Sequence, residues 1–321
     1  MLRYSIMRLG QMGVVLLAVS LIVFVIMNLT GDPVLLLVPP EATDAEIAQA
    51  RAQLGLDLPL WKQYGIFLQN LMQGDMGVSY MFRRPAVELI LERMPATLEM
   101  TVFAMVLAGG LAIPMGLYAG AYPDRIFSKL IMSASLLGIS LPSFWLGIML
   151  ILIFAVQLQI MPSSGRGEVV TLFGVRTSIF TADGLHHLIM PAVTLAVAQM
   201  AMLIRLTRAG IMEVMRQDYI KFAKAKGMSA NRVLFGHALK NALIPVITVF
   251  GLQFGQLIAF ATITETIFAW PGMGKLLIDS IYRVDRPVIV AYLMMVAVLF
   301  VIINFLVDII YTMIDPRIEV K

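Results

Sequence analysis

The chain contains 321 residues, of which 60% are hydrophobic and 14% are charged, and its formal net charge is +4. This composition lies far outside the range of soluble globular domains and indicates an integral membrane protein. The sequence has no cysteine, which excludes disulfides, thiolate metal sites and cysteine nucleophiles.

Six apolar runs are long enough to cross a bilayer, which takes about 20 helical residues. They predict an all-α integral membrane fold with six transmembrane helices. The first run is longer than the apolar core of a signal peptide and has no small-x-small cleavage site after it, so we interpret it as an uncleaved span. The runs lie near 9–29, 97–121, 130–157, 187–207, 241–266 and 288–312.

Lysine and arginine near the span ends predict the orientation. Basic residues precede the first span, lie between the second and third, crowd the segment after the fourth and follow the sixth. With six spans these segments share one side, which the positive-inside rule assigns to the cytoplasm, so both termini are expected inside. The residues are Arg3, Arg8, Arg125, Lys129, Arg205, Arg208, Arg216, Lys221, Lys224, Lys226, Arg232, Lys240, Arg317 and Lys321.

The segment 30–94 is expected to form a small helical subdomain on the external side. It contains start and stop signals for several short helices. Two interpretations stay open at equal weight: a cap that packs on the spans, and a surface that receives a delivering protein. The signals are a capping-box pair at Thr43 and Glu46 with a stop at Gly55, a start at Pro59 with a stop at Gly74, and a start at Pro85.

The chain is therefore expected to have three parts. Residues 1–29 are the N-terminal segment and first span, 30–94 the external subdomain, and 95–321 the core with spans two to six. Within the core, a second outer loop at 160–186 has Val, Thr and Phe runs that could form a hairpin.

The segment 209–240, between the fourth and fifth spans, is the most informative part of the sequence. A polar helix is expected there, then a turn at Gly227, which can take a positive φ, and a second helix that Ser229 can cap. By itself this pattern fits a basic elbow at the membrane surface. The residues expected on one face of the first helix are Tyr219, Phe222, Ala223 and Lys226.

Ala223, Gly227 and their neighbours resemble the cytoplasmic loop of ABC importer permeases. The signature of that loop has an acidic residue, two alanines and a glycine four residues after the second alanine. Here Lys221 and Phe222 replace its first two positions, and Pro245 stands further along than the expected Leu-Pro. These departures are the ones found in the dipeptide, oligopeptide and nickel permease branch.

Other segments extend this resemblance over nearly the whole chain. The long external region after the first span is similar to that of the first of the two paired permease subunits in such systems. The matching segments are GDP at 31–33, LGLDLPL at 54–60, GDMGVS at 74–79, SLPSFWLG at 140–147, FAWPGMGKLL at 268–277 and DPR at 315–317.

The resemblance implies the type I ABC importer permease fold and a role as half of a translocation path for di- or oligopeptides, with nickel chelates or glutathione as alternative substrates. It implies a bacterial inner-membrane location and three kinds of protein partner besides lipid: a second permease, two cytoplasmic ATPases and an external substrate-binding protein, with no nucleic acid. ATP and Mg would be bound by the ATPases, so this chain would carry no cofactor and no catalytic site. The residues implied in ATPase coupling are Tyr219, Lys221, Phe222, Ala223, Lys224, Lys226, Gly227 and Ser229.

Polar residues inside the spans are candidates for a translocation path, because burying them in lipid is costly. Gln253 and Gln256 lie within about 60° of each other on a helix that turns about 100° per residue. Gln199 in the fourth span is a weaker candidate. Hydrogen bonding between helices is an equally weighted alternative for these glutamines. A separate small-residue face, Gly251, Gly255 and Ala259, fits close helix packing.

The segment PGMGK at 271–275 looks like part of a phosphate-binding loop but lacks its first glycine and has Leu276 where Ser or Thr is required. A turn that leads into a short helix is the favoured interpretation. The functional alternative is an external gate or a contact for the binding protein. The residues concerned are Trp270, Pro271, Gly272 and Gly274.

An intramembrane hydrolase is the rival from another class, and it would need a buried nucleophile with a base, or metal ligands. His186, His187 and His237 belong to no HExxH pattern, and the sequence around Ser140 is not GxSxG. Surface or interfacial histidines are the better interpretation.

The charged residues within the spans lie near their ends. Glu99 and Glu265 are close to the outer ends of spans two and five, and Asp308 is toward the inner end of span six. A proton- or sodium-coupled carrier would usually keep an ionisable group at the midplane, so the pattern favours an external energy source.

Overall fold

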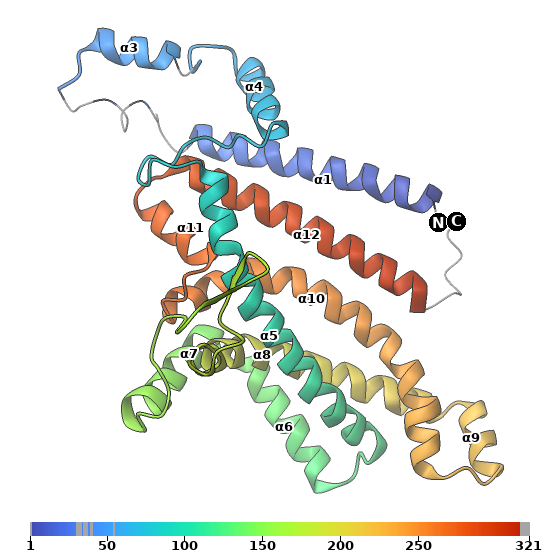
Figure 1. The fold of residues 1–321 in the computed structure, drawn as a ribbon. Coiled ribbons are helices and arrows are strands. Elements are labelled where there is room, and N and C mark those ends of the chain that lie inside the picture. The colour runs from blue at the N-terminus through green and yellow to red at the C-terminus, as the bar shows by residue number, and fades with distance from the viewer. Residues whose placement is uncertain (1, 30–33, 35–37, 39–40, 54, 315–321) are drawn as a thin grey trace. The chain divides into compact units, whose positions relative to one another are not determined.

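The computed structural model describes residues 2–29, 34, 38, 41–53 and 55–314, which are mostly helical (Figure 1). Five of the helices are each long and apolar enough to cross a membrane. The helices are α1 (Leu2–Leu29), α3 (Asp44–Gln53), α4 (Leu60–Met72), α5 (Ala86–Ala121), α6 (Ile126–Ser140), α7 (Ser143–Leu150), η1 (Ile151–Gln157), α8 (Ala182–Val214), α9 (Asp218–Ala225), η2 (Arg232–Ala238), α10 (Leu239–Ile267), α11 (Met273–Tyr282) and α12 (Arg286–Ile314).

The chain divides into two compact units, one of residues 1–93 with 276–301 and one of residues 94–275 with 302–321. The expected boundary at 94–95 falls inside α5, which runs through it without a break. For the same reason, the helix expected to start at Pro85 is not a separate element of an external subdomain: it is the first part of α5, because no stop signal separates it from the apolar span.

In the first unit, α4 packs on α1 through aromatic rings. The ring centroid of Phe24 lies 5.3 Å from that of Tyr64 and 5.8 Å from that of Phe67. The loop before α5 is hydrogen-bonded to Asp285, the residue directly before α12. The Asp285 carboxylate accepts from the Ser79 hydroxyl and from the Tyr80 N–H, the latter at 3.1 Å. The unit is therefore held together both by aromatic packing between α1 and α4 and by hydrogen bonds to Asp285.

The helix signals in this unit are confirmed at α3 and α4. The Thr43 N–H donates to the Glu46 carboxylate at 2.8 Å, and the Glu46 N–H donates to the Thr43 hydroxyl at 3.4 Å, which is the reciprocal pattern of a capping box. α4 begins directly after Pro59. Gly55 and Gly74 both take positive φ, as residues that end a helix commonly do.

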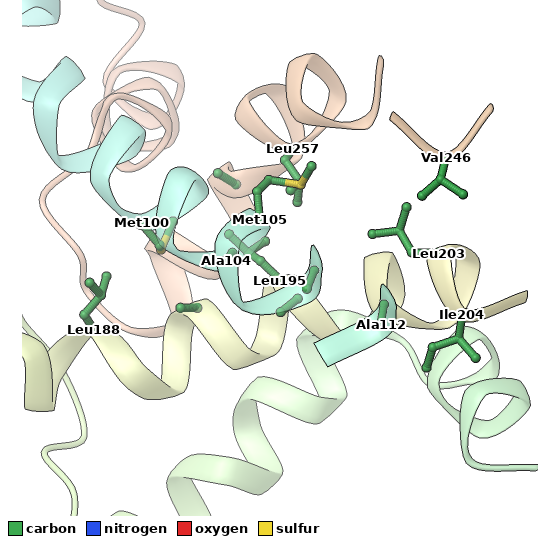
Figure 2. Close-up of a cluster of buried hydrophobic side chains, with 14 of the residues drawn as sticks. Met100, Ala104, Met105, Ala112, Leu188, Leu195, Leu203, Ile204, Val246 and Leu257 are labelled. Atoms are coloured by element: carbon green, nitrogen blue, oxygen red, sulfur yellow. The ribbon is translucent and has the colours of Figure 1, made fainter. Parts of the chain in front are cut away.

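The second unit has its apolar core where α5, α8 and α10 meet (Figure 2). α5 and α8 approach closely where α5 has glycine in place of a larger residue. A Cβ at Gly116 would lie only 2.6 Å from the Thr207 Cβ, and one at Gly120 only 2.8 Å from the Ile211 Cβ. Such contacts let helix backbones pack at short range in a membrane. The labelled core side chains are Met100, Ala104, Met105 and Ala112 of α5, Leu188, Leu195, Leu203 and Ile204 of α8, and Val246 and Leu257 of α10.

The third predicted span is not one straight helix. α6 and the α7–η1 helix meet at a bend of 104°, so the expected run 130–157 is broken, and a sixth span exists only if this bent pair is counted as one. The break lies at Leu141, whose ψ is 126°, directly before Pro142. A proline cannot donate a helix hydrogen bond and disfavours helical geometry in the residue before it, which explains the break.

The loop between η1 and α8 contains the hairpin expected in 160–186. Strands β1 (Val170–Leu172) and β2 (Val175–Thr177) pair antiparallel, with Leu172 opposite Val175. Phe173 and Gly174 form the two-residue turn with φ of 50° and 79°. Positive φ at both central residues is the geometry that suits tight hairpins.

Candidate functional site

The candidate site is the elbow between α8 and α10, where α9 lies across the ends of both (Figure 1). Two side chains of α9, Ile220 and Ala223, are buried. They belong to an apolar cluster that α5, α8, η2 and α10 complete, so α9 is anchored to four other elements. The buried members are Leu117, Ile211, Ile220, Ala223, Val233, Leu234, Ala238 and Ala242.

The opposite face of α9 is exposed and carries aromatic and basic side chains. Phe222 is 61% exposed, and the Lys226 ammonium lies 4.6 Å from the centre of its ring. The Tyr219 hydroxyl accepts a hydrogen bond at 2.8 Å from the side-chain amide of Asn241. This face therefore combines an apolar projection with positive charge, which suits docking to another protein.

Lys221 forms a local ion pair with Asp218, with 2.8 Å between the ammonium nitrogen and the carboxylate oxygen. The hydrogen bond from Lys221, and secondarily its charge, lower the pKa of Asp218 below its usual value. The carboxylate at the first turn of α9 is thus held in its ionised form, where it also faces the positive end of the helix dipole.

Gly227 ends α9 in a Schellman motif. Its φ is 79°, its N–H donates to the Lys224 carbonyl at 3.0 Å, and the Met228 N–H donates to the Ala223 carbonyl at 3.3 Å. Glycine takes this left-handed conformation without strain, which is why it suits the position. The next helical turn follows Ser229, whose carbonyl accepts from the Val233 N–H at 3.0 Å.

The structure divides the residues that were expected to share one face of α9. Ala223 is buried, whereas Tyr219, Phe222 and Lys226 are exposed. Ala223 pairs instead with Ile220, three residues earlier, which sequence reasoning missed. The apolar i, i+3 pair was the signal that could have identified the anchored face.

The three candidate path glutamines lie in α8 and α10. Gln199 and Gln253 are partly buried, and Gln256 is exposed. The side-chain oxygen of Gln253 is buried and has no hydrogen-bond partner among the described residues. Of the expected small-residue face, Gly251 packs against Val307 of α12 and Gly255 is buried, whereas Ala259 is exposed.

The turn between α10 and α11 is a buried elbow. The Trp270 side chain is fully buried, and its indole N–H donates to the Ala96 carbonyl at 2.9 Å. Glu265 is also fully buried, and its carboxylate accepts from the Thr97 hydroxyl at 2.6 Å and from the Lys275 N–H at 2.9 Å. The indole is therefore a structural anchor in this conformation and offers no exposed contact.

The two glycines of this elbow permit close approach. A Cβ at Gly272 would overlap the Glu265 carboxylate, and one at Gly274 would lie 2.6 Å from the Thr262 Cα. Pro271, between Trp270 and Gly272, is partly buried. Sequence reasoning placed Glu265 only near a span end and did not connect it with Thr97, since 168 residues separate the two.

These features define the class of protein: a multi-pass membrane protein with a short helix, α9, in the elbow between α8 and α10, one face of which is buried and the other exposed. Residues 112–320 match the family described as binding-protein-dependent transport system inner membrane component, and residues 1–101 match the family of its N-terminal part. The chain belongs to this family of transport permeases and is an inner-membrane protein.

Relatives cover the chain from end to end. It is 41% identical to the di/tripeptide transport system permease protein DppB of Pseudomonas aeruginosa, over 99% of each chain. It is 41% identical to the oligopeptide transport system permease protein AppB of Bacillus subtilis, over 95% of each, and 39% identical to the glutathione transport system permease protein GsiC of Escherichia coli O6:H1, over 100% of each.

A solved structure shares the fold. The chain superposes with a TM-score of 0.56 on a chain from inward-facing conformations of the MetNI methionine ABC transporter, covering 71% of this chain and 96% of that one. At 18% identity this likeness concerns the fold alone.

Proposed function

We propose that this chain is one of two permease subunits of an ATP-driven importer and forms half of the translocation path for di- or oligopeptides. The observation that carries the proposal is the full-length 41% identity to a permease named for di- and tripeptides. Glutathione, itself a peptide, is the alternative substrate that the GsiC relative supports. A nickel chelate remains an expectation of the sequence resemblance.

α9 is the proposed coupling helix, which would sit in a groove of a cytoplasmic ATPase. Two observations support this role. Its buried face, Ile220 and Ala223, packs in one apolar cluster with residues of α8 and α10, which gives a route for a displacement of α9 to reach both long helices. Its exposed face offers Phe222 with Lys224 and Lys226 to a partner. ATP and Mg would be bound by that partner, and this chain would hydrolyse nothing.

We propose that α9 and both termini lie in the cytoplasm and the loop 158–181 outside, and the distribution of basic residues supports this orientation. A second homologous permease would complete the path, two ATPases would bind inside, and a substrate-binding protein would deliver the ligand outside to the surface of the helices in 30–94. Gln199, Gln253 and Gln256 are proposed to line the path. The elbow at 270–274 is proposed as part of an external gate. It would act through its buried hydrogen bonds to α5 and not through an exposed contact.

Reconstitution of the assembled transporter in proteoliposomes tests the function. We expect uptake of labelled dipeptide that requires ATP and the binding protein. Absence of uptake for dipeptide, longer peptides and glutathione by an assembled complex that hydrolyses ATP would overturn the peptide substrate class.

The same assay tests α9 through Phe222→Ala, which leaves the buried anchor intact. We expect the variant subunit to fold and insert normally but to lose at least about tenfold of ATP-driven uptake, because exposed aromatic side chains commonly dominate docking energy. Phe127→Ala is the matched control, since Phe127 lies outside α9 and is 57% exposed. Equal uptake by the two variants would refute the coupling role of α9.

A further inference from the structure

Glu99 of α5 is the centre of a buried polar cluster, here called the Glu99 cluster, that also contains Arg166 and Ser178. The Arg166 guanidinium donates from Nε to the Glu99 Oε2 atom at 3.1 Å and also from Nη2 to the same oxygen. The Ser178 N–H donates to Oε1 at 2.9 Å, and the Ser178 hydroxyl donates to Oε1 as well. Both oxygens of the carboxylate are therefore occupied by groups from the loop 158–181.

The loop 158–181 is held at its ends by contacts with α8, since the Glu168 N–H donates to the Asp183 carboxylate at 2.7 Å and the Ile160 carbonyl lies 2.8 Å from a ring nitrogen of His186. Arg166 and Ser178 are its only two buried residues, and both contact Glu99. The hairpin at its centre is exposed, with Phe173 97% accessible. The polar contacts to Glu99 therefore hold the buried part of the loop, next to Ile179, which packs against the apolar core.

The cluster also connects the loop to the α10–α11 elbow. The Gly165 N–H donates to the Phe268 carbonyl at 2.8 Å, and the Arg166 guanidinium lies 5.9 Å from the centre of the Trp270 ring. Trp270 in turn donates to Ala96, one turn of α5 before Glu99. The loop 158–181 and the α10–α11 elbow, which are distant from α5 in sequence, thus both contact the same turn of α5.

From these contacts we infer that Arg166 and Glu99 are positioning residues for transport, which hold the loop 158–181 and the α10–α11 elbow on α5 as one body. The inference rests on the proposed function, because it concerns the transport step. A buried ion pair contributes little net stability compared with well-packed apolar residues, but its geometry is strict. Its role here is to fix the position of the loop, so that a movement of α5 and α10 carries the loop and the elbow together.

Three variants separate positioning from stability. Arg166→Met removes the charge and donors and keeps most of the volume. Arg166→Lys keeps the charge. The double variant Glu99→Met with Arg166→Met replaces the whole ion pair by apolar side chains, which commonly restores stability. Each is assembled with its partner subunits in nanodiscs or proteoliposomes, and complex yield, ATP hydrolysis, dipeptide uptake and hydrogen exchange of 158–181 are measured.

We expect Arg166→Met to reduce uptake about tenfold at a complex yield within about twofold of wild type, and to raise hydrogen exchange in 158–181 but not in α9. Arg166→Lys should retain about a third or more of the uptake. The double variant should assemble and hydrolyse ATP while its uptake stays as low as that of Arg166→Met.

Three results would overturn the inference. The first is wild-type uptake by Arg166→Met, and the second is recovery of uptake in the double variant. The third is failure of both Arg166→Met and the double variant to assemble, which would show that the ion pair is needed for folding. If the wild-type complex itself transports no peptide, the proposed function fails instead. The hydrogen-exchange comparison then still decides whether Arg166 holds the loop.

Discussion

Glu265, in the last turns of α10, is a fully buried carboxylate whose partners come from two other elements. The Thr97 hydroxyl on α5 and the Lys275 N–H on α11 both donate to it, at 2.6 and 2.9 Å. Gly272 leaves the space that the carboxylate fills. Together with the Trp270 indole, which donates to the Ala96 carbonyl, this carboxylate holds the turn through which the chain leaves α10.

Replacing Glu265 by alanine should destabilise the protein strongly. The change leaves the donors of Thr97 and Lys275 buried without acceptors, at a cost of about 1–3 kcal/mol each. Glu265→Gln keeps an acceptor oxygen at nearly the same volume and should cost clearly less. Thermal unfolding of the detergent-solubilised complex measures the difference. Equal unfolding temperatures for the two variants would show that the hydrogen bonds contribute nothing.

At this scale, sequence reasoning identified side chains by type and missed their partners. It singled out Gly227 correctly as a position for positive φ, because that property depends only on local backbone geometry. It did not pair Glu265 with Thr97, or Glu99 with Arg166, because those contacts depend on the arrangement of helices in space. Local chemistry is readable from a short window of sequence, and tertiary hydrogen bonding is not.

Among the helices, the contact between α5 and α8 depends on glycine. A Cβ at Gly120 would lie 2.8 Å from the Ile211 Cβ and 2.9 Å from the Arg208 carbonyl oxygen, and the second of these is backbone that cannot rotate away. Ile211 also belongs to the cluster that anchors α9. The spacing of α5 and α8 is thus linked to the position of the proposed coupling helix.

Gly120→Ala should force α5 and α8 apart and lower the free energy of unfolding by about 1–3 kcal/mol, the usual cost of overpacking. The chain offers a matched control in Gly110 of the same helix, where a Cβ would meet nothing within 4 Å. Gly110→Ala should be neutral or stabilising by roughly 0.5–1 kcal/mol, since alanine loses less backbone entropy in a helix. Thermal unfolding of both variants in detergent checks this, and similar losses in both would contradict the close-contact explanation.

Helix ends were predictable from the sequence, but helix continuity was not. The capping box at Thr43 and the start at Pro59 act through neighbouring residues and are confirmed. The bend at Pro142 was overlooked although proline is a known helix breaker, because the apolar run continues across it. Pro114, in contrast, lies inside the continuous helix α5. Whether a proline bends or breaks a span depends on the packing around it.

For the whole molecule, the bent pair of α6 and α7–η1 decides the membrane topology. If the pair crosses the bilayer, the chain has six spans, and the loop 122–125 and the hairpin at 170–177 lie on opposite sides. If the pair enters and leaves on one side, only the five long helices cross, and these two loops lie on the same side. The basic residues around α9 favour six spans, since five would place that segment opposite to Arg125 and Lys129.

Because the sequence contains no cysteine, single introduced cysteines can report this topology without a background signal. Phe173→Cys, at a position 97% exposed at the tip of the hairpin, should react with a membrane-impermeant maleimide in intact cells. Arg125→Cys, in the exposed turn between α5 and α6, should react only after the membrane is permeabilised. The unmodified chain, which should not be labelled, is the control. Labelling of both positions under the same condition would instead establish five spans, with the bent pair as a re-entrant segment and α9 on the side opposite to residue 125.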